Sequence, residues 1–255
     1  SQFGTVSFSH LVGAAAVTAM SRGYFIVTAR DVHDVAGGVP RLDGCLMFAP
    51  NYHDESLQWL QRTNIPVVSY DPDPGDANFN WWAGADYAPS ITKLMVHLLD
   101  RSARRIAVIV GQTNNTYRRA LLSTYASVMR SAGLSPMIRM ADNAGGQNAA
   151  LEVASELLTR RERPDAILTT SSVFATGVLT AATAASLSVP KDLKIATVTD
   201  GPLAEFADPP ITGLRINAMK TAATMIDLLE KRLRDENPPA VNPRIELDLI
   251  SRGST

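Results

Sequence analysis

One stretch of this chain, residues 164–202, constrains the fold more than any other. Residues 166–169 form a short apolar run that ends in three polar residues, 170–172, which predicts a buried strand followed by a helix N-cap. Apolar residues then recur every three or four positions up to residue 185, which predicts a helix, and residues 193–198 form a second apolar run. A strand, a helix and a strand of these lengths indicate a right-handed βαβ unit of a parallel sheet.

Polar residues follow both strands of this unit, where parallel sheets bind their ligands. Ser171 follows the first strand, and Asp200 follows the second. A carboxylate in the position of Asp200 can accept hydrogen bonds from two ligand hydroxyl groups. The alternative is that Asp200 only caps the turn before Gly201 and Pro202.

The alternation of strands and helices extends along the whole chain, which indicates an α/β fold. The expected helices span residues 8–22, 56–61, 88–99, 117–132, 148–158 and 218–234. The other expected strands span residues 24–29, 42–50, 65–71, 81–85, 106–111, 136–140, 211–216 and 245–250.

The composition narrows the class of protein. Of the 255 residues, 45% are hydrophobic and 19% are charged, which suits a globular protein of one or two lobes. A formal net charge of −1 excludes nucleic-acid binding by charge alone. No apolar run approaches the roughly 20 residues that span a bilayer, so no membrane contact is expected. The single cysteine, Cys45, lies in an apolar run, where we expect an inert buried thiol, and its isolation fits a reducing cytoplasm.

Signals of catalysis are absent from the sequence. It contains no Gly-x-Ser-x-Gly elbow, no phosphate-binding loop and no His-Glu-x-x-His motif. The segment Asp31-Val32-His33-Asp34 could hold a metal ion, but a solvated loop is the better interpretation. We therefore expect neither an enzyme, nor a metal site, nor a cofactor.

Four motifs near the end of the chain resemble, in order and spacing, the ligand-binding core of the LacI/GalR family of bacterial transcription regulators. They are Ala175-Thr176-Gly177, then Val189-Pro190-Lys191-Asp192 with Asp200, then Pro209-Pro210-Ile211-Thr212, and the closing Arg252-Gly253-Ser254-Thr255. Ser171-Ser172 stands where the family has Asn-Asp. Leu42-Asp43-Gly44 and Ile65-Pro66-Val67-Val68 extend the resemblance to most of the chain.

The resemblance implies two similar α/β lobes with parallel sheets, the periplasmic-binding-protein type I fold, with a ligand cleft between them. Residues 1–102 with 217–244 would form the N-terminal lobe, and residues 103–216 with 245–255 the C-terminal lobe. The family's helix-turn-helix head is absent from this sequence, and only seven residues stand where the family has its first strand. We therefore expect a fragment.

The function implied is that of a cytoplasmic regulator core. A small-molecule effector, a sugar or related polar metabolite, would bind between the lobes of a homodimer and change the lobe angle. Operator DNA would be bound only through the missing head. The alternative is a periplasmic sugar-binding protein of a transporter, which shares the fold and would carry a signal peptide upstream.

The candidate effector-binding residues are Phe8, Asn51, Asp71, Trp81, Asp86, Asn114, Asn115, Leu121, Ser171, Asp200 and Ile216. Helix capping is the alternative role for Asn114 and Asn115, and packing in the strand core is the alternative for Trp81. Three positions depart from the family, because Leu121 replaces its Arg, Ser171 its Asn and Ile216 its Gln. A site with lost hydrogen bonds should not share the ligand of a typical sugar-responsive member.

Overall fold

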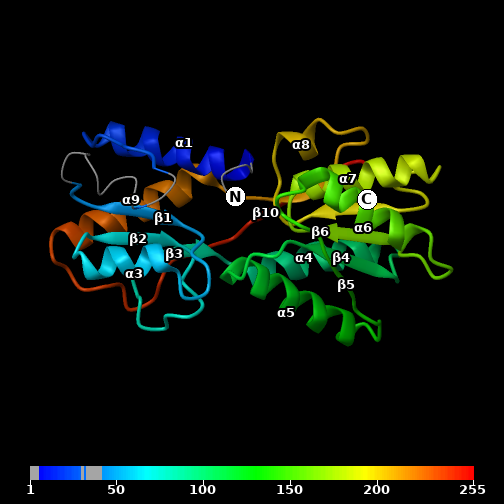
Figure 1. Cartoon of the computed structure of the whole chain (residues 1–255), viewed down its shortest axis with the longest axis horizontal. Helices are drawn as coiled ribbons and strands as arrows, with labels where there is room; N and C mark the ends of the chain where they lie inside the picture. Colours follow the sequence, from blue (N-terminus) through cyan, green and yellow to red (C-terminus); the bar gives the residue numbers. More distant parts are fainter. Residues whose placement is uncertain (1–5, 30–31, 33–41) are drawn as a thin grey trace.

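Two sheets with helices on both faces make up the computed structural model of this chain, which describes residues 6–29, 32 and 42–255 (Figure 1). In the first lobe the strand order is β1-β2-β3-β9, and every pair is parallel. The strands are β1 (Cys45–Phe48), β2 (Val67–Tyr70), β3 (Trp82–Ala85) and β9 (Arg244–Ile245). Helices α1 (Val6–Ser21) and α9 (Ala218–Leu233) pack together on one face, and α3 (Glu55–Arg62) covers the other.

The second lobe has the strand order β10-β8-β7-β6-β4-β5, and only β10 runs antiparallel to its neighbour. Its strands are β4 (Ile106–Val110), β5 (Met137–Met140), β6 (Ala166–Thr169), β7 (Lys194–Thr197), β8 (Thr212–Arg215) and β10 (Asp248–Ile250). Helices α4 (Tyr87–Asp100) and α5 (Thr116–Ser131) cover one face. Helices α6 (Gly146–Leu158), α7 (Ser172–Ala184) and the short α8 (Pro202–Glu205) cover the other.

The βαβ unit predicted from residues 164–202 is confirmed as β6, α7 and β7. Strands β6 and β7 pair in parallel, and Ser171 caps α7 by accepting a hydrogen bond from the backbone N–H of Phe174. Gly177 lets α7 approach α6 closely, because a Cβ atom at this position would lie 2.3 Å from the carbonyl oxygen of Gln147. The Ala-x-Gly motif therefore serves the packing of two helices.

The closing Arg-Gly-Ser-Thr motif ties the end of the chain to the second sheet. The Ser254 hydroxyl donates to the carbonyl oxygen of Ile195 at 2.6 Å and accepts from the N–H of Thr212 at 2.9 Å. The Thr255 hydroxyl lies 2.8 Å from the Thr212 hydroxyl and 2.9 Å from Nε2 of His97. These bonds satisfy buried polar groups between the sheet and α4.

The lobe boundaries differ from those expected from the sequence. Helix α4 packs on α5, β8 and β10, so the first crossing between lobes precedes it, near Asp86, rather than at residue 102. The single strand expected at 245–250 is instead two strands, because β9 pairs with β3 in the first sheet and β10 with β8 in the second. The chain therefore makes its last crossing at Glu246 and Leu247.

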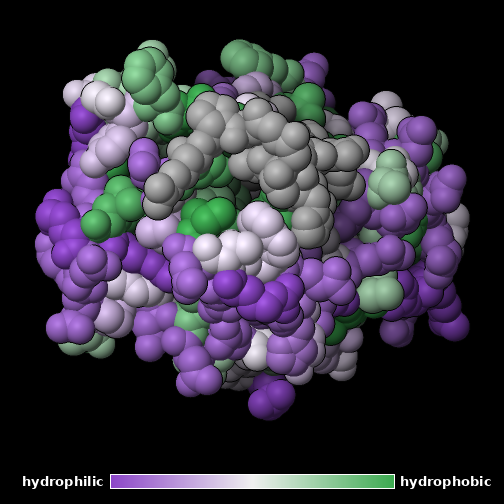
Figure 2. Space-filling view, turned by 60° about the vertical axis from the view of Figure 1, so that its left-hand side comes forward, coloured by the Kyte–Doolittle hydropathy of each residue, from purple (hydrophilic) through white to green (hydrophobic). Residues whose placement is uncertain are grey.

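The strand expected at 24–29 does not form in the structure. These residues have no regular structure and are all exposed, with Phe25 fully so. A strand requires hydrogen bonds from a neighbour, and no described segment pairs with these residues. Apolar side chains consequently stay on the surface here. Figure 2 shows one face of the molecule, largely hydrophilic with scattered hydrophobic patches.

The described residues contain neither a membrane-spanning helix nor a cluster of metal-ligating side chains. None of the helices in the described ranges is long and apolar enough to cross a bilayer. No three side chains of His, Cys, Asp or Glu in those ranges gather as metal ligands would, and the segment Asp31–Asp34 lies outside the described residues apart from Val32.

Candidate functional site

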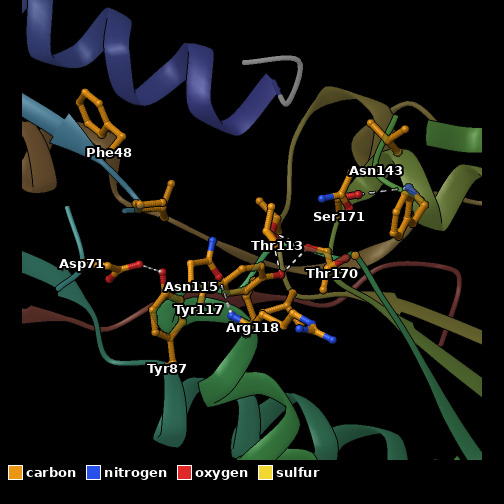
Figure 3. A pocket seen from close by; sticks show the side chains of 18 of the residues that line it. Phe48, Asp71, Tyr87, Thr113, Asn115, Tyr117, Arg118, Asn143, Thr170 and Ser171 are labelled. Atoms are coloured by element: carbon orange, nitrogen blue, oxygen red, sulfur yellow. Dashed lines mark hydrogen bonds between the residues drawn. The ribbon is translucent and has the colours of Figure 1, made fainter. Parts of the chain in front are cut away.

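A cavity of about 470 Å³ lies between the lobes, at the carboxyl ends of both sets of parallel strands. Figure 3 shows Phe48 and Asp71 on the side of the first lobe, opposite Ser171 and Asn143 of the second. The lining comprises Leu11, Phe48, Ala49, Tyr70, Asp71, Tyr87, Gly111, Thr113, Asn115, Tyr117, Arg118, Asn143, Ala144, Gly146, Thr170, Ser171, Val173, Phe174, Val198, Thr199, Asp200, Leu214, Ile216 and Leu247.

Asp71 follows β2 and is the acidic residue of the first-lobe side. Its backbone has a φ of 67°, a left-handed conformation that Asp tolerates better than most residues, and the residue is 2% exposed. Tyr87 Oη donates to Oδ2 at 2.5 Å, and the N–H of Ala85 donates to Oδ1 at 3.4 Å. A Cβ atom at Gly84 would lie 2.4 Å from Oδ1, so the glycine makes room for this carboxyl group.

Burial is the main influence on the pKa values of Asp71 and the two tyrosines beside it. It raises the pKa of Asp71 to about 7, against the opposing effects of the bond from Tyr87, the bond from Ala85 and the charge of Arg244. Burial also raises the pKa values of Tyr70 and Tyr87, so both phenols are neutral at physiological pH. Asp71 is therefore divided between its neutral and charged forms near neutral pH.

Tyr117, in the first turn of α5, stands at the middle of the cavity (Figure 3). Its hydroxyl donates to the carbonyl oxygen of Thr170 and lies 3.2 Å from the hydroxyl of Thr199. The Thr199 hydroxyl also donates to the Thr170 carbonyl, at 2.7 Å. The ring of Tyr117 is 5.4 Å from that of Tyr87 between centroids, so two aromatic rings face the cavity together.

Arg118 is the next residue on α5 and also lines the cavity. Its Nε atom is buried and has no hydrogen-bond partner among the described residues. Its Nη2 atom lies 3.3 Å from the sulfur of Met140, and the guanidinium forms no ion pair with a described carboxylate. The cavity wall therefore contains a half-buried cation that has no anionic partner in the described part of the chain.

The carboxylate of Asp200 is bound by two arginines. Both of its oxygens are bound by Arg252, at 2.8 Å and 2.9 Å, and Arg215 Nε donates to Oδ2 at 2.8 Å. The Asp200 side chain is 0% exposed, and the two guanidinium groups lower the pKa of its carboxyl group against the effect of burial. Asp200 lines the cavity, but its carboxylate is engaged in holding the chain terminus rather than available as an open acceptor.

The structure brings only part of the predicted site together. Asp71, Asn115, Ser171, Asp200 and Ile216 line the cavity. Asn51, Trp81, Asp86, Asn114 and Leu121 lie outside its lining. Phe8 belongs to α1, but the structure does not describe its side chain. Leu11 of the same helix lines the cavity.

Three of the predicted residues that lie outside the cavity lining are placed as follows. Leu121 is fully buried in the core, one turn beyond Arg118, which lines the cavity from the first turn of α5. Trp81 packs in the first lobe with Arg232 5.5 Å above its ring. Asp86 begins α4, yet its side chain makes no capping bond.

Asn51 and Asn114 join the lobes beside the cavity. Asn51 forms an isolated bridge with Asn115, and the N–H of Tyr52 donates to the carbonyl oxygen of Asn114 at 2.8 Å. The guanidinium of Arg119 lies 4.7 Å from the ring centroid of Tyr52. Asn115 also caps α5, as the alternative interpretation expected, by accepting from the N–H of Arg118.

The sequence interpretation missed Tyr70, Tyr87, Tyr117 and Arg118. Tyr117 and Arg118 follow Asn114-Asn115, so a search extended by one helical turn beyond the loop would have found them. Tyr70 and Tyr87 each adjoin a predicted residue, Asp71 and Asp86, and carried no separate signal.

Comparison with known proteins identifies the family. Residues 95–255, more than half of the chain, match the model of the periplasmic binding protein-like domain. The chain belongs to this family. The ribose operon repressor of Escherichia coli (strain K12) is 31% identical over 225 residues, which cover 84% of this chain and 65% of the repressor. The HTH-type transcriptional repressor PurR of Glaesserella parasuis serovar 5 (strain SH0165) is 28% identical over 80% of the chain and 60% of its own length.

Solved structures agree on the fold. A complex of the transcriptional regulator CelR with cellobiose has a TM-score of 0.88 at 23% identity, covering 99% of this chain and 80% of that one. A LacI family regulator from Arthrobacter sp. FB24 in complex with lactose has a TM-score of 0.83 at 22% identity, covering 99% and 96%. These structures are similar to the chain in fold, and the chain spans less than two thirds of the length of the curated repressors it matches.

Proposed function

We propose that this chain is the effector-sensing core of a transcription regulator, which binds a small molecule in the cavity between its lobes. The observation that carries the proposal is the cavity itself, of about 470 Å³, within the usual range for small-molecule sites. It is lined from both lobes, so a ligand there contacts both and favours one lobe arrangement over others.

The curated relatives support a regulator over a transporter's binding protein and over an enzyme, because they are repressors. In this proposal the chain acts in the cytoplasm and reaches operator DNA only through a helix-turn-helix head. Contacts such as the Asn51–Asn115 bridge would open or close as the lobe angle changes, and this change would pass to the head.

Ligand binding should raise the melting temperature of the chain. A ligand at about 100 times its Kd stabilises the folded state by about 2.7 kcal/mol, which corresponds to a shift of roughly 5 °C or more for a chain of this size. Differential scanning fluorimetry with a metabolite library, together with mass spectrometry of molecules that copurify, tests this. Failure of every candidate to shift the transition, with no copurified molecule, would count against an effector core.

We also expect a homodimer. Val17 is 59% exposed, Met20 67% and Phe25 100%, so α1 and the segment after it leave apolar surface in water that a second copy could cover. Sedimentation at tens of micromolar should give twice the chain mass of 27.4 kDa. A single species of 27.4 kDa at that concentration would contradict this expectation.

A further inference from the structure

We infer that the effector is an organic acid with a flat, mostly apolar body, whose carboxylate binds Arg118, rather than a neutral sugar. The inference rests on the proposed function, because it takes the cavity between the lobes as the effector site. Three observations support it: the charges of the residues that line the cavity, the hydrogen bonds that their polar side chains already make within the protein, and the apolar and aromatic residues among them.

The charge balance favours an anion. Of the residues that the structure describes, three with carboxylate or guanidinium side chains line the cavity: Asp71, Arg118 and Asp200. Asp200 is neutralised by Arg215 and Arg252, and Glu205 lies 3.1 Å from Arg215 to balance the second arginine. Asp71 lies on the opposite side of the cavity from Arg118, hydrogen-bonded to Tyr87 (Figure 3). Among the described residues of the lining, Arg118 is therefore the uncompensated charge, and its buried Nε has an unused proton.

Four of the other polar side chains that line the cavity are already bound within the protein, and Thr113 and Asn143 also line it. Tyr117 and Thr199 are bound to the Thr170 carbonyl, Ser171 caps α7 and Asn115 caps α5. A sugar needs several free donors and acceptors around its ring, since each unpaired hydroxyl would be desolvated at a cost. A single carboxylate needs only one free side chain that donates hydrogen bonds. A guanidinium has the best shape for this, because it binds a carboxylate through two parallel hydrogen bonds.

The remaining walls suit a ring or short apolar body. Phe48, Phe174 and Ile216 join the rings of Tyr87 and Tyr117 in the lining. Apolar and aromatic surface of this kind binds a flat ligand by area burial and ring contacts. Asp71 can meet such a ligand in its neutral form, because burial raises its pKa to about 7. The anion therefore does not have to approach a fixed negative charge.

Calorimetry with matched acids and amides tests the inference. The probes are benzoate, phenylacetate and cinnamate, their primary amides, and the sugars ribose and cellobiose. We expect at least one acid to bind and its amide to bind at least about tenfold more weakly, since a charge-assisted hydrogen bond is lost. The substitution Arg118→Gln should lower the affinity for the acid by roughly ten- to a hundredfold and leave the affinity for the amide unchanged.

The matched control is Arg130→Gln, which removes the same charge from the exposed last turn of the same helix and should change neither affinity. Thermal melts of both variants establish that they fold. If no acid binds, or if acids bind Arg118→Gln as well as the parent, the inference is wrong. Binding of ribose or cellobiose in that case would leave the proposed function intact, whereas a failure of every probe, with no copurified ligand, would contradict both.

Discussion

Asp200→Ala should lower the free energy of unfolding by about 3–5 kcal/mol, the range for removing one partner of a buried ion pair. The Asp200 side chain is 0% exposed and that of Arg252 only 10%, so the substitution leaves a guanidinium buried without its carboxylate. The remaining partners of Arg252 are the Ile211 carbonyl oxygen and Glu205, the latter 3.9 Å away. Chemical denaturation at neutral pH measures the loss.

The control is Glu205→Gln, which removes an exposed acid from the same cluster and should cost less than about 1 kcal/mol. The pKa of Asp200 is lowered in the folded state, so its contribution is present above the unfolded pKa and is lost as pH falls. The difference in the free energy of unfolding between the parent and Asp200→Ala should therefore become smaller at acidic pH. A loss no larger than that of Glu205→Gln at neutral pH would mean that Asp200 is only a turn cap.

The α/β alternation and the βαβ unit at residues 164–202 could be predicted from the sequence because the strands are short apolar runs between turn residues. The two lobes were expected from the family resemblance, and both sheets are present in the structure. The errors lie at residues 24–29, where the expected strand has no neighbour to pair with, and where the chain changes lobes. An apolar pattern shows that residues 245–250 are extended, but it does not tell which sheet each residue joins, since this depends on contacts distant in sequence.

The site was harder to predict because it depends on where side chains point and on what they already bind. Asp200 and Arg252 were both recognised in separate motifs, yet nothing in their spacing shows that they bind each other. Leu121 and Arg118 lie one turn apart on α5, and their spacing does not tell that the first turn of that helix borders the cavity while the next packs into the core. Polar residues after strands were located correctly, but not their hydrogen-bond partners.

Asp71→Asn should make the chain relatively more stable as pH rises. The folded pKa of Asp71 is raised to about 7, so the group stabilises the fold below its unfolded pKa of about 3.9 and loses this contribution as pH rises through the folded value. Asparagine fills the same space without titrating. Each unit of pKa shift corresponds to about 1.4 kcal/mol, so the variant should gain up to about 4 kcal/mol on the parent between about pH 4 and pH 8.

Denaturant titrations of both proteins across this pH range measure the gain, and the slope of the difference against pH is the informative quantity. An absolute offset of about 1 kcal/mol is expected at every pH, because the single amide oxygen can accept from only one of Tyr87 and Ala85. Asp100→Asn, the same change on an exposed residue at the end of α4, should show no comparable slope. Parallel curves for the parent and Asp71→Asn would mean that Asp71 ionises normally, and then an anionic effector would meet a fixed negative charge across the cavity from Arg118.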